Sequence, residues 1–106
     1  MLALRWSRLS RTDRKMFRIA LLCEGIPAEI GVQAAIDVAE EFTHRPWHQN
    51  VSCTWKNSNL VLVADNDFDH NGEALADEFS DAVAACTKAT FGYRIRKGSV
   101  VKLAGD

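Results

Sequence analysis

The chain has 106 residues, of which 47% are hydrophobic and 25% charged, and this composition is typical of one globular domain. It contains no apolar run near the about 20 residues of a membrane span, and only six glycines, which excludes a collagen-like chain. The formal net charge is -1, but the charges are unevenly spread.

The N-terminal segment is strongly basic. Residues 1–18 hold six Lys or Arg side chains against one acid, Asp13, whereas the rest of the chain is acidic. We therefore predict a basic arm over residues 1–15, unstructured or a short helix, before a single domain over residues 16–106. Such an arm binds an anionic partner, pairs with the protein's own acidic helices or stays solvated. Met16 directly precedes the first predicted strand and is an alternative start of translation.

The elements follow from the apolar spacing and the turn residues. The pattern predicts strands over 17–24, 51–56, 59–64 and 92–103, and helices over 28–43 and 73–88. Asn57 and Ser58 form a two-residue hairpin signal. An acidic loop is predicted over 65–72, and a bend in the last strand near Gly98.

Each predicted helix has one apolar stripe, which we expect to face the core. The first stripe consists of Val32, Ala35, Ile36, Ala39 and Phe42, and the second of Leu75, Phe79, Ala82 and Cys86. The three cysteines are widely spaced and form no CxxC motif. This pattern favours buried, reduced thiols in a cytoplasmic protein.

The element order is β-α-β-β-α-β, which predicts an α+β fold of the ferredoxin-like kind. We expect a four-stranded antiparallel sheet in the order 4-1-3-2, with both helices on one face. The first and third strands are apolar on both sides, which suits the two central positions.

The other face of this sheet would be open, with an apolar centre and a basic rim. Its candidate binding residues are Arg18, Leu22, Lys56, Arg94 and Arg96. An exposed apolar patch is usually covered, so we expect a homodimer, an acidic protein or a small anionic ligand there. The central strands lack the exposed aromatic side chains on which bases stack, which argues against nucleic acid. No membrane contact is predicted.

A calcium-loop pattern covers residues 67–78. The segment fits D-x-[DN]-x-[DN]-G-x5-E without a mismatch and resembles an EF-hand loop over these twelve residues only. Its candidate metal ligands are Asp67, Asp69, Asn71, Glu73 and Glu78. A strand precedes the loop where an EF-hand has a helix. Helix capping by Asp and Asn explains the same residues.

The irregular stretch 44–50 holds a second, weaker candidate site at His44, Trp47 and His48. No nucleophile elbow, P-loop or dinucleotide fingerprint occurs in the chain. The sequence therefore favours a non-enzymatic binding module without a catalytic residue or cofactor. The alternatives are a calcium-binding protein using residues 67–78 and a small enzyme with a pocket near residues 44–50.

Overall fold

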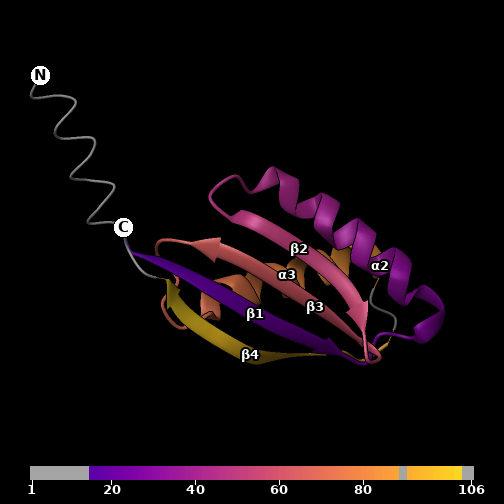
Figure 1. Ribbon diagram of the computed structural model, residues 1–106. Coiled ribbons are helices and arrows are strands. Elements are labelled where there is room, and N and C mark those ends of the chain that lie inside the picture. Colours follow the sequence, from indigo (N-terminus) through magenta and orange to yellow (C-terminus); the bar gives the residue numbers. More distant parts are fainter. Residues whose placement is uncertain (1–14, 89–90, 104–106) are drawn as a thin grey trace, which may run out of the picture.

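The computed structural model of the protein describes residues 15–88 and 91–103 (Figure 1). Along the chain the elements are β1 (Met16–Glu24), α2 (Ala28–Glu41), the short 3-10 helix η1 (Phe42–His44), β2 (Gln49–Lys56), β3 (Asn59–Asn66), α3 (Glu73–Thr87) and β4 (Arg94–Leu103). The predicted α+β class and element order are confirmed. Apart from Lys15, the predicted arm lies outside the described residues. No helix in the described part of the chain is long and apolar enough to cross a membrane.

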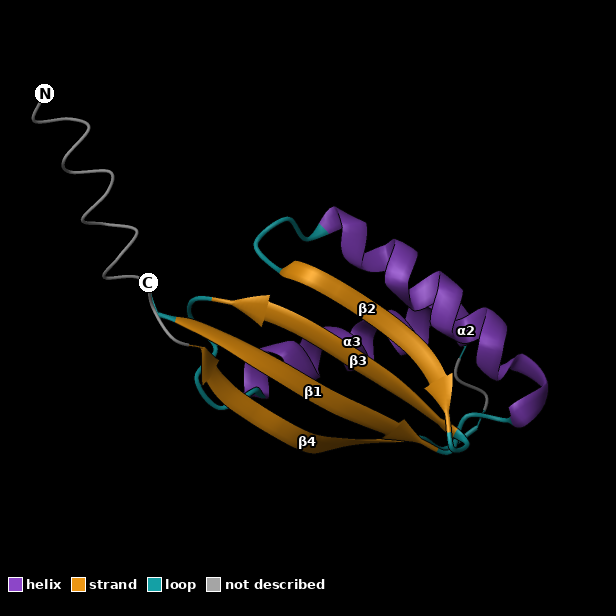
Figure 2. Cartoon of the chain, viewed as in Figure 1, coloured by secondary structure: helices purple, strands orange, loops and turns teal. Residues whose placement is uncertain are grey.

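The four strands form one sheet in the order β2-β3-β1-β4, which reads 4-1-3-2 when it is taken from the β4 edge. All three strand pairs are antiparallel, which confirms the predicted kind of sheet. Both helices cover the same face of the sheet, with α3 behind the central strands and α2 along the β2 side (Figure 2). No helix of the described residues covers the opposite face.

The core lies between the sheet and the helices. From Ile19 through Leu21 to Cys23, every second residue of β1 is fully buried, and the residues between them face the other way. In β3 the buried set is Leu60, Leu62 and Ala64, while the intervening valines turn to the other face. From α3 the predicted residues Leu75, Phe79 and Ala82 are buried, and Val83 joins them.

The predicted core face of α2 is wrong in part. Its buried residues are Gly31, Ala34, Ala35 and Val38, followed by Phe42 in η1. Val32 and Ile36 are instead 62% and 55% exposed. The reason is close packing on β2, because a Cβ at Gly31 would overlap the Trp55 indole ring. The helix turns its smallest side chains toward the sheet, and the larger apolar residues rotate outward.

The turns agree with their sequence signals. Asn57 and Ser58 both have positive φ, 53° and 65°, as a type I′ hairpin requires, and Lys56 pairs with Asn59 across them. At Gly98 the ladder between β1 and β4 shifts, since Ala20 pairs with Ser99 but Leu21 pairs with Lys97.

Several predicted ends need correction. The first helix stops at Glu41 rather than Thr43, because the next residues tighten into η1. The third strand continues to Asn66, two residues past its predicted end, because Phe17 and Arg18 of β1 pair with that extension. The second strand begins at Gln49, the last at Arg94, and the second helix ends at Thr87.

Candidate functional site

The face without helices, called the open face from here on, is ordered in rows by the strand register. One row contains Thr54, Val61, Leu22 and Arg96, and the next contains Ser52, Val63, Ala20 and Ser99. In both rows the two central strands supply apolar side chains, and the edge strands supply polar ones. The open face therefore has a narrow apolar centre with polar margins.

Charged side chains occupy both ends of these rows. At one end Arg18 forms two parallel hydrogen bonds with Asp65, from Nε to Oδ1 and from Nη2 to Oδ2, each 2.9 Å long. Asn50 donates a third hydrogen bond to Oδ2 of the same carboxylate, also at 2.9 Å. The hydrogen bonds from the Arg18 guanidinium hold the pKa of the Asp65 carboxyl below its usual range, against the opposing effect of burial. The carboxylate of Asp65 therefore neutralises the charge of Arg18, which is one of the cations of the predicted basic rim.

The other end keeps free positive charge. Register places Lys56, Asn59, Glu24 and Arg94 in one row there, with Arg96 in the row beside it. Arg96 Nη1 donates to Glu24 Oε2 at 2.6 Å. Within residues 15–88 and 91–103, the side chains of Lys56 and Arg94 form no ion pair, and both residues are exposed. Of the five predicted binding residues, the structure brings Lys56, Arg94 and Arg96 to one end, with Leu22 next to them.

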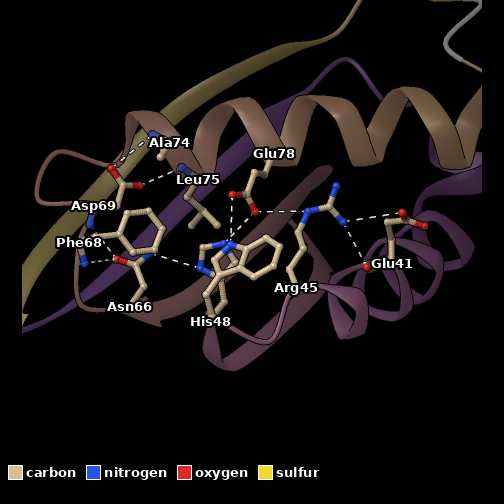
Figure 3. A network of polar contacts seen from close by, with 10 residues as sticks. Glu41, Arg45, His48, Asn66, Phe68, Asp69, Ala74, Leu75 and Glu78 are labelled. Carbon is tan, nitrogen blue, oxygen red and sulfur yellow. Dashed lines mark hydrogen bonds and ion pairs between the residues drawn. The ribbon is translucent and has the colours of Figure 1, made fainter.

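A second cluster joins the loop after η1 to β3 and α3 (Figure 3). At its centre lies the His48 side chain, which is 0% exposed. The carboxylate of Glu78 on α3 forms hydrogen bonds with His48 Nε2, at 2.8 Å, and with Trp47 Nε1, at 3.3 Å. It also forms an ion pair with Arg45, whose Nε lies 3.3 Å away. Arg45 also donates to the Glu41 backbone carbonyl at the end of α2. One carboxylate therefore ties the 45–48 loop to α3.

The other side of the His48 ring contacts Asn66. Asn66 Oδ1 accepts the backbone N–H groups of Phe68, at 3.1 Å, and of Asp69, at 2.8 Å. The amide nitrogen of Asn66 must then point to His48 Nδ1, 3.3 Å away. Since an amide N–H donates, Nδ1 is the acceptor and the ring carries its proton on Nε2, toward Glu78. Both ring nitrogens are engaged, so neither is open to a substrate proton in this arrangement.

The remaining residues of the predicted loop site lie at the surface. His44 ends η1 and is exposed, and the hydrogen-bond network of Figure 3 does not include it. Trp47 is half exposed. It borders a polar hollow of about 260 Å³ lined by Met16, Pro46, Trp47, Gln49, Asn66 and Asp67. The structure thus brings Trp47 and His48 together through Glu78, and leaves His44 apart.

Two of the predicted calcium ligands, Asp69 and Asn71, accept backbone hydrogen bonds from the start of α3. Asp69 caps α3, because its two carboxylate oxygens accept the backbone N–H groups of Ala74, at 3.2 Å, and Leu75, at 2.8 Å. Asn71 accepts the backbone N–H of Glu73 at 3.1 Å. Among the described residues, no three His, Cys, Asp or Glu side chains gather into a group that could hold a metal ion. Asp67 lies exposed at the start of the loop.

The cysteines are free, and their surroundings disfavour thiolate. Burial raises the pKa of Cys53 to about 12 and of Cys23 to about 11, and it raises the pKa of Cys86 as well. A thiol with such a pKa is a weak nucleophile at neutral pH. None of the three is therefore arranged as a catalytic nucleophile.

Sequence reasoning missed Asp65, Asn66 and Arg45. Both strand-end residues, Asp65 and Asn66, are 1% exposed, whereas the sequence predicts an acidic loop from residue 65 onward. A buried polar side chain needs a partner, but the partners Arg18 and His48 lie 47 and 18 residues away along the chain. No local spacing signals such a pair.

In comparisons with family models, with curated proteins and with solved structures, nothing matches this chain.

Proposed function

We propose that the protein is a non-enzymatic interaction module of ferredoxin-like architecture, which docks an acidic, extended protein segment on its open face. The observation that carries this proposal is the free positive charge of Lys56 and Arg94 beside an exposed apolar centre. The β-α-β-β-α-β order and the sheet order support the architecture.

The charge balance of the open face favours an acidic partner. Its rows hold four cations, Arg18, Lys56, Arg94 and Arg96, against the two carboxylates of Glu24 and Asp65. Because Arg18 and Arg96 are paired internally, the attraction comes mainly from Lys56 and Arg94. These two lie on opposite edge strands, about 14 Å apart across three strand spacings. An extended segment that crosses the strands can meet both.

The apolar centre supplies the second half of the recognition. Leu22, Val61 and Val63 are only half buried although they lie on the two central strands. Apolar side chains in the middle of the partner segment would cover them, and carboxylates toward its two ends would meet Lys56 and Arg94. The contacting residues would be two apart, because successive side chains of an extended segment point to opposite sides. Burial of apolar area contributes about 25 cal/mol per Å², while the charges guide the approach.

In the cluster around His48 and Glu78 the polar groups already form hydrogen bonds with one another. This supports a binding role over an enzymatic one. His48 has both ring nitrogens engaged, and Glu78 serves three donors at once. Among the described residues, no buried side-chain nitrogen or oxygen lacks a partner. Such a network holds elements together.

The test uses a fluorescein-labelled decapeptide with valines in its middle and glutamates toward both ends, titrated with protein at 50 mM NaCl and followed by fluorescence anisotropy. We expect saturable binding that weakens as salt rises. The double variant Lys56→Glu/Arg94→Glu should weaken it at least tenfold. A matched control, Lys88→Glu/Lys102→Glu, makes the same charge change elsewhere, since Lys88 follows α3 and Lys102 lies on the other side of the sheet by register.

Far-UV circular dichroism of both double variants establishes that they are folded. Absence of saturable binding to the wild-type protein would overturn the proposal. Equal loss in the two double variants would overturn it as well, because net charge alone would then explain the attraction. Equal binding of the same decapeptide with lysines in place of the glutamates would contradict the acidic specificity.

A further inference from the structure

The outer edge of the sheet at β2 has no neighbouring strand from residues 15–88 and 91–103. Strand β2 pairs with β3 on its other side, and its clean register runs from Ser52 to Lys56. The pair Lys56 and Asn59 closes a two-residue hairpin and so exchanges both backbone hydrogen bonds. By alternation, Cys53 and Trp55 direct their backbone N–H and C=O groups outward. Edges are usually protected by charge, proline or a bulge. The four residues Ser52–Trp55 carry none of these, although the register is irregular just before Ser52 and Lys56 follows Trp55.

An exposed apolar pair lies beside this edge. Val32 and Ile36 are one helical turn apart on α2, and they are 62% and 55% exposed. The α2 residues that face α3 are Ile30, Ala34 and Asp37, which line a hollow together with Cys86 of α3. Val32 and Ile36 lie on the opposite flank of the helix, and α2 runs along the free side of β2 (Figure 1).

The two features share one centre. Gly31 lies against Trp55, and α2 runs antiparallel to β2 (Figure 1). With a rise of about 1.5 Å per helical residue and about 3.4 Å per strand residue, the midpoint of Val32 and Ile36 is level with Cys53 and Thr54. Thr54 is also the midpoint of the clean edge Ser52–Lys56. A single two-fold axis at this point would therefore place the β2 edge against the β2 edge of a second copy, and the Val32–Ile36 pair against the same pair of that copy.

We propose that a second copy of this chain docks on the surface formed by the β2 edge and the Val32–Ile36 pair. The two β2 strands pair antiparallel about Thr54, which extends the four-stranded sheet into a continuous sheet of eight strands. The α2 helices pack across the axis through Val32 and Ile36. Such an isologous contact is the usual geometry of a homodimer.

The backbone and side-chain chemistry fits this register. Around Thr54, Cys53 of one copy pairs with Trp55 of the other, and these are the residues whose backbone groups point outward. Lys56 of one copy lies opposite Ser52 of the other, so no like charges meet on the strand. Glu29 and Glu40 are exposed on α2, so the two acidic helices bring like charges toward each other. Because these carboxylates repel, we expect the dimer to tighten as salt rises.

The dimer also explains why the sequence and the monomer disagree about α2. The helical spacing predicts Val32 and Ile36 on a buried face, and the single chain leaves both exposed. Burial against a second copy satisfies the pattern without changing the fold. Docking on the open face and dimerisation are distinguished by their variants. Val32 and Ile36 lie on α2, away from the open face, and Arg94 lies on β4, at the other edge of the sheet. Lys56 ends the β2 edge and belongs to both surfaces.

The test measures the oligomeric state by sedimentation velocity from 1 to 500 µM protein, at 0.05 and 0.5 M NaCl. We expect a reversible dimer that is tighter at high salt. The double variant Val32→Ser/Ile36→Ser should weaken it at least tenfold without unfolding, because both side chains are exposed in the monomer. The control Val101→Ser removes a half-exposed apolar residue on β4, at the other edge, and should leave the dimer intact.

A cross-link tests the register. Residues opposite each other in a non-hydrogen-bonded antiparallel pair have Cβ atoms about 4.5–5.5 Å apart, which is near disulfide geometry. Thr54→Cys should therefore form a covalent dimer on mild oxidation, whereas Ser99→Cys on β4 should not. A wild-type monomer at 500 µM, a dimer that survives Val32→Ser/Ile36→Ser, or a dimer that dissociates with salt would each overturn the proposal. Equal cross-linking of the two cysteine variants would overturn the register.

Discussion

The Cα atom of Gly31 on α2 lies against the indole ring of Trp55 on β2, so closely that any side chain at position 31 would overlap the ring. This contact determines how near the helix approaches the sheet edge. It also determines which face of α2 is buried.

Gly31→Ala should therefore destabilise the protein by about 1–3 kcal/mol, the usual cost of overpacking. A loss of stability would be informative, because alanine stabilises an isolated helix by about 1 kcal/mol relative to glycine. Urea unfolding followed by Trp fluorescence measures the difference. Gly92→Ala is the control, since a Cβ at position 92 meets no atom within 4 Å, and we expect a change below about 0.5 kcal/mol. A stabilised Gly31→Ala variant would show that Trp55 moves aside freely.

Removal of the carboxylate at position 78 should loosen the 45–48 loop. Glu78→Ala leaves the buried His48 Nε2–H without an acceptor, and we expect a loss of about 1–3 kcal/mol in unfolding free energy. Glu78→Gln keeps an acceptor oxygen and should lose less. The exposed neighbour Asp77 provides the control variant Asp77→Ala. In ¹⁵N-correlated NMR of the wild type, the His48 proton should reside on Nε2, and a proton on Nδ1 would contradict the Asn66 orientation.

Stability should fall in acid through Asp65. The pKa of this carboxyl is lowered in the folded protein, so its contribution is present above the ordinary Asp pKa of about 3.9 and is lost as pH falls below that value. Urea midpoints of wild type and Asp65→Asn should thus differ most at pH 6 and converge toward pH 3. Asp81→Asn, on the exposed side of α3, should show no such convergence. A constant difference between wild type and Asp65→Asn across this range would contradict the ion pair with Arg18.

Calcium should leave the protein's stability unchanged. Both oxygens of Asp69 accept backbone N–H groups of α3, and Glu78 is occupied by the 45–48 loop. We expect the same thermal midpoint in 1 mM calcium and in EDTA, because a calcium site needs several free oxygen ligands. Asp69→Ala should cost about 1–2 kcal/mol in either solution through the lost helix cap. Calcium-dependent stabilisation that Asp67→Ala abolishes would instead establish a metal site.

The amino-acid sequence by itself determined the features that depend on neighbours along the chain. The apolar spacing and the turn residues predicted the order of strands and helices, and the Asn57–Ser58 dipeptide predicted the hairpin. The irregularity at Gly98 was also predictable. In each case the deciding interaction lies within a few residues, or follows from the two-residue period of a strand.

Tertiary structure decided the features that depend on a distant surface. Strand β3 is apolar on both faces, so only its packing against the helices placed Leu60, Leu62 and Ala64 inside. Likewise, the spacing in α2 favours Val32 and Ile36 as core residues, but the Trp55 ring rotates the helix and exposes them. Glu78 fits a calcium motif in sequence, and it pairs with His48, which lies 30 residues earlier in the chain. Periodicity shows that a face is apolar or acidic, whereas the side chain that fills the space opposite it comes from another part of the chain.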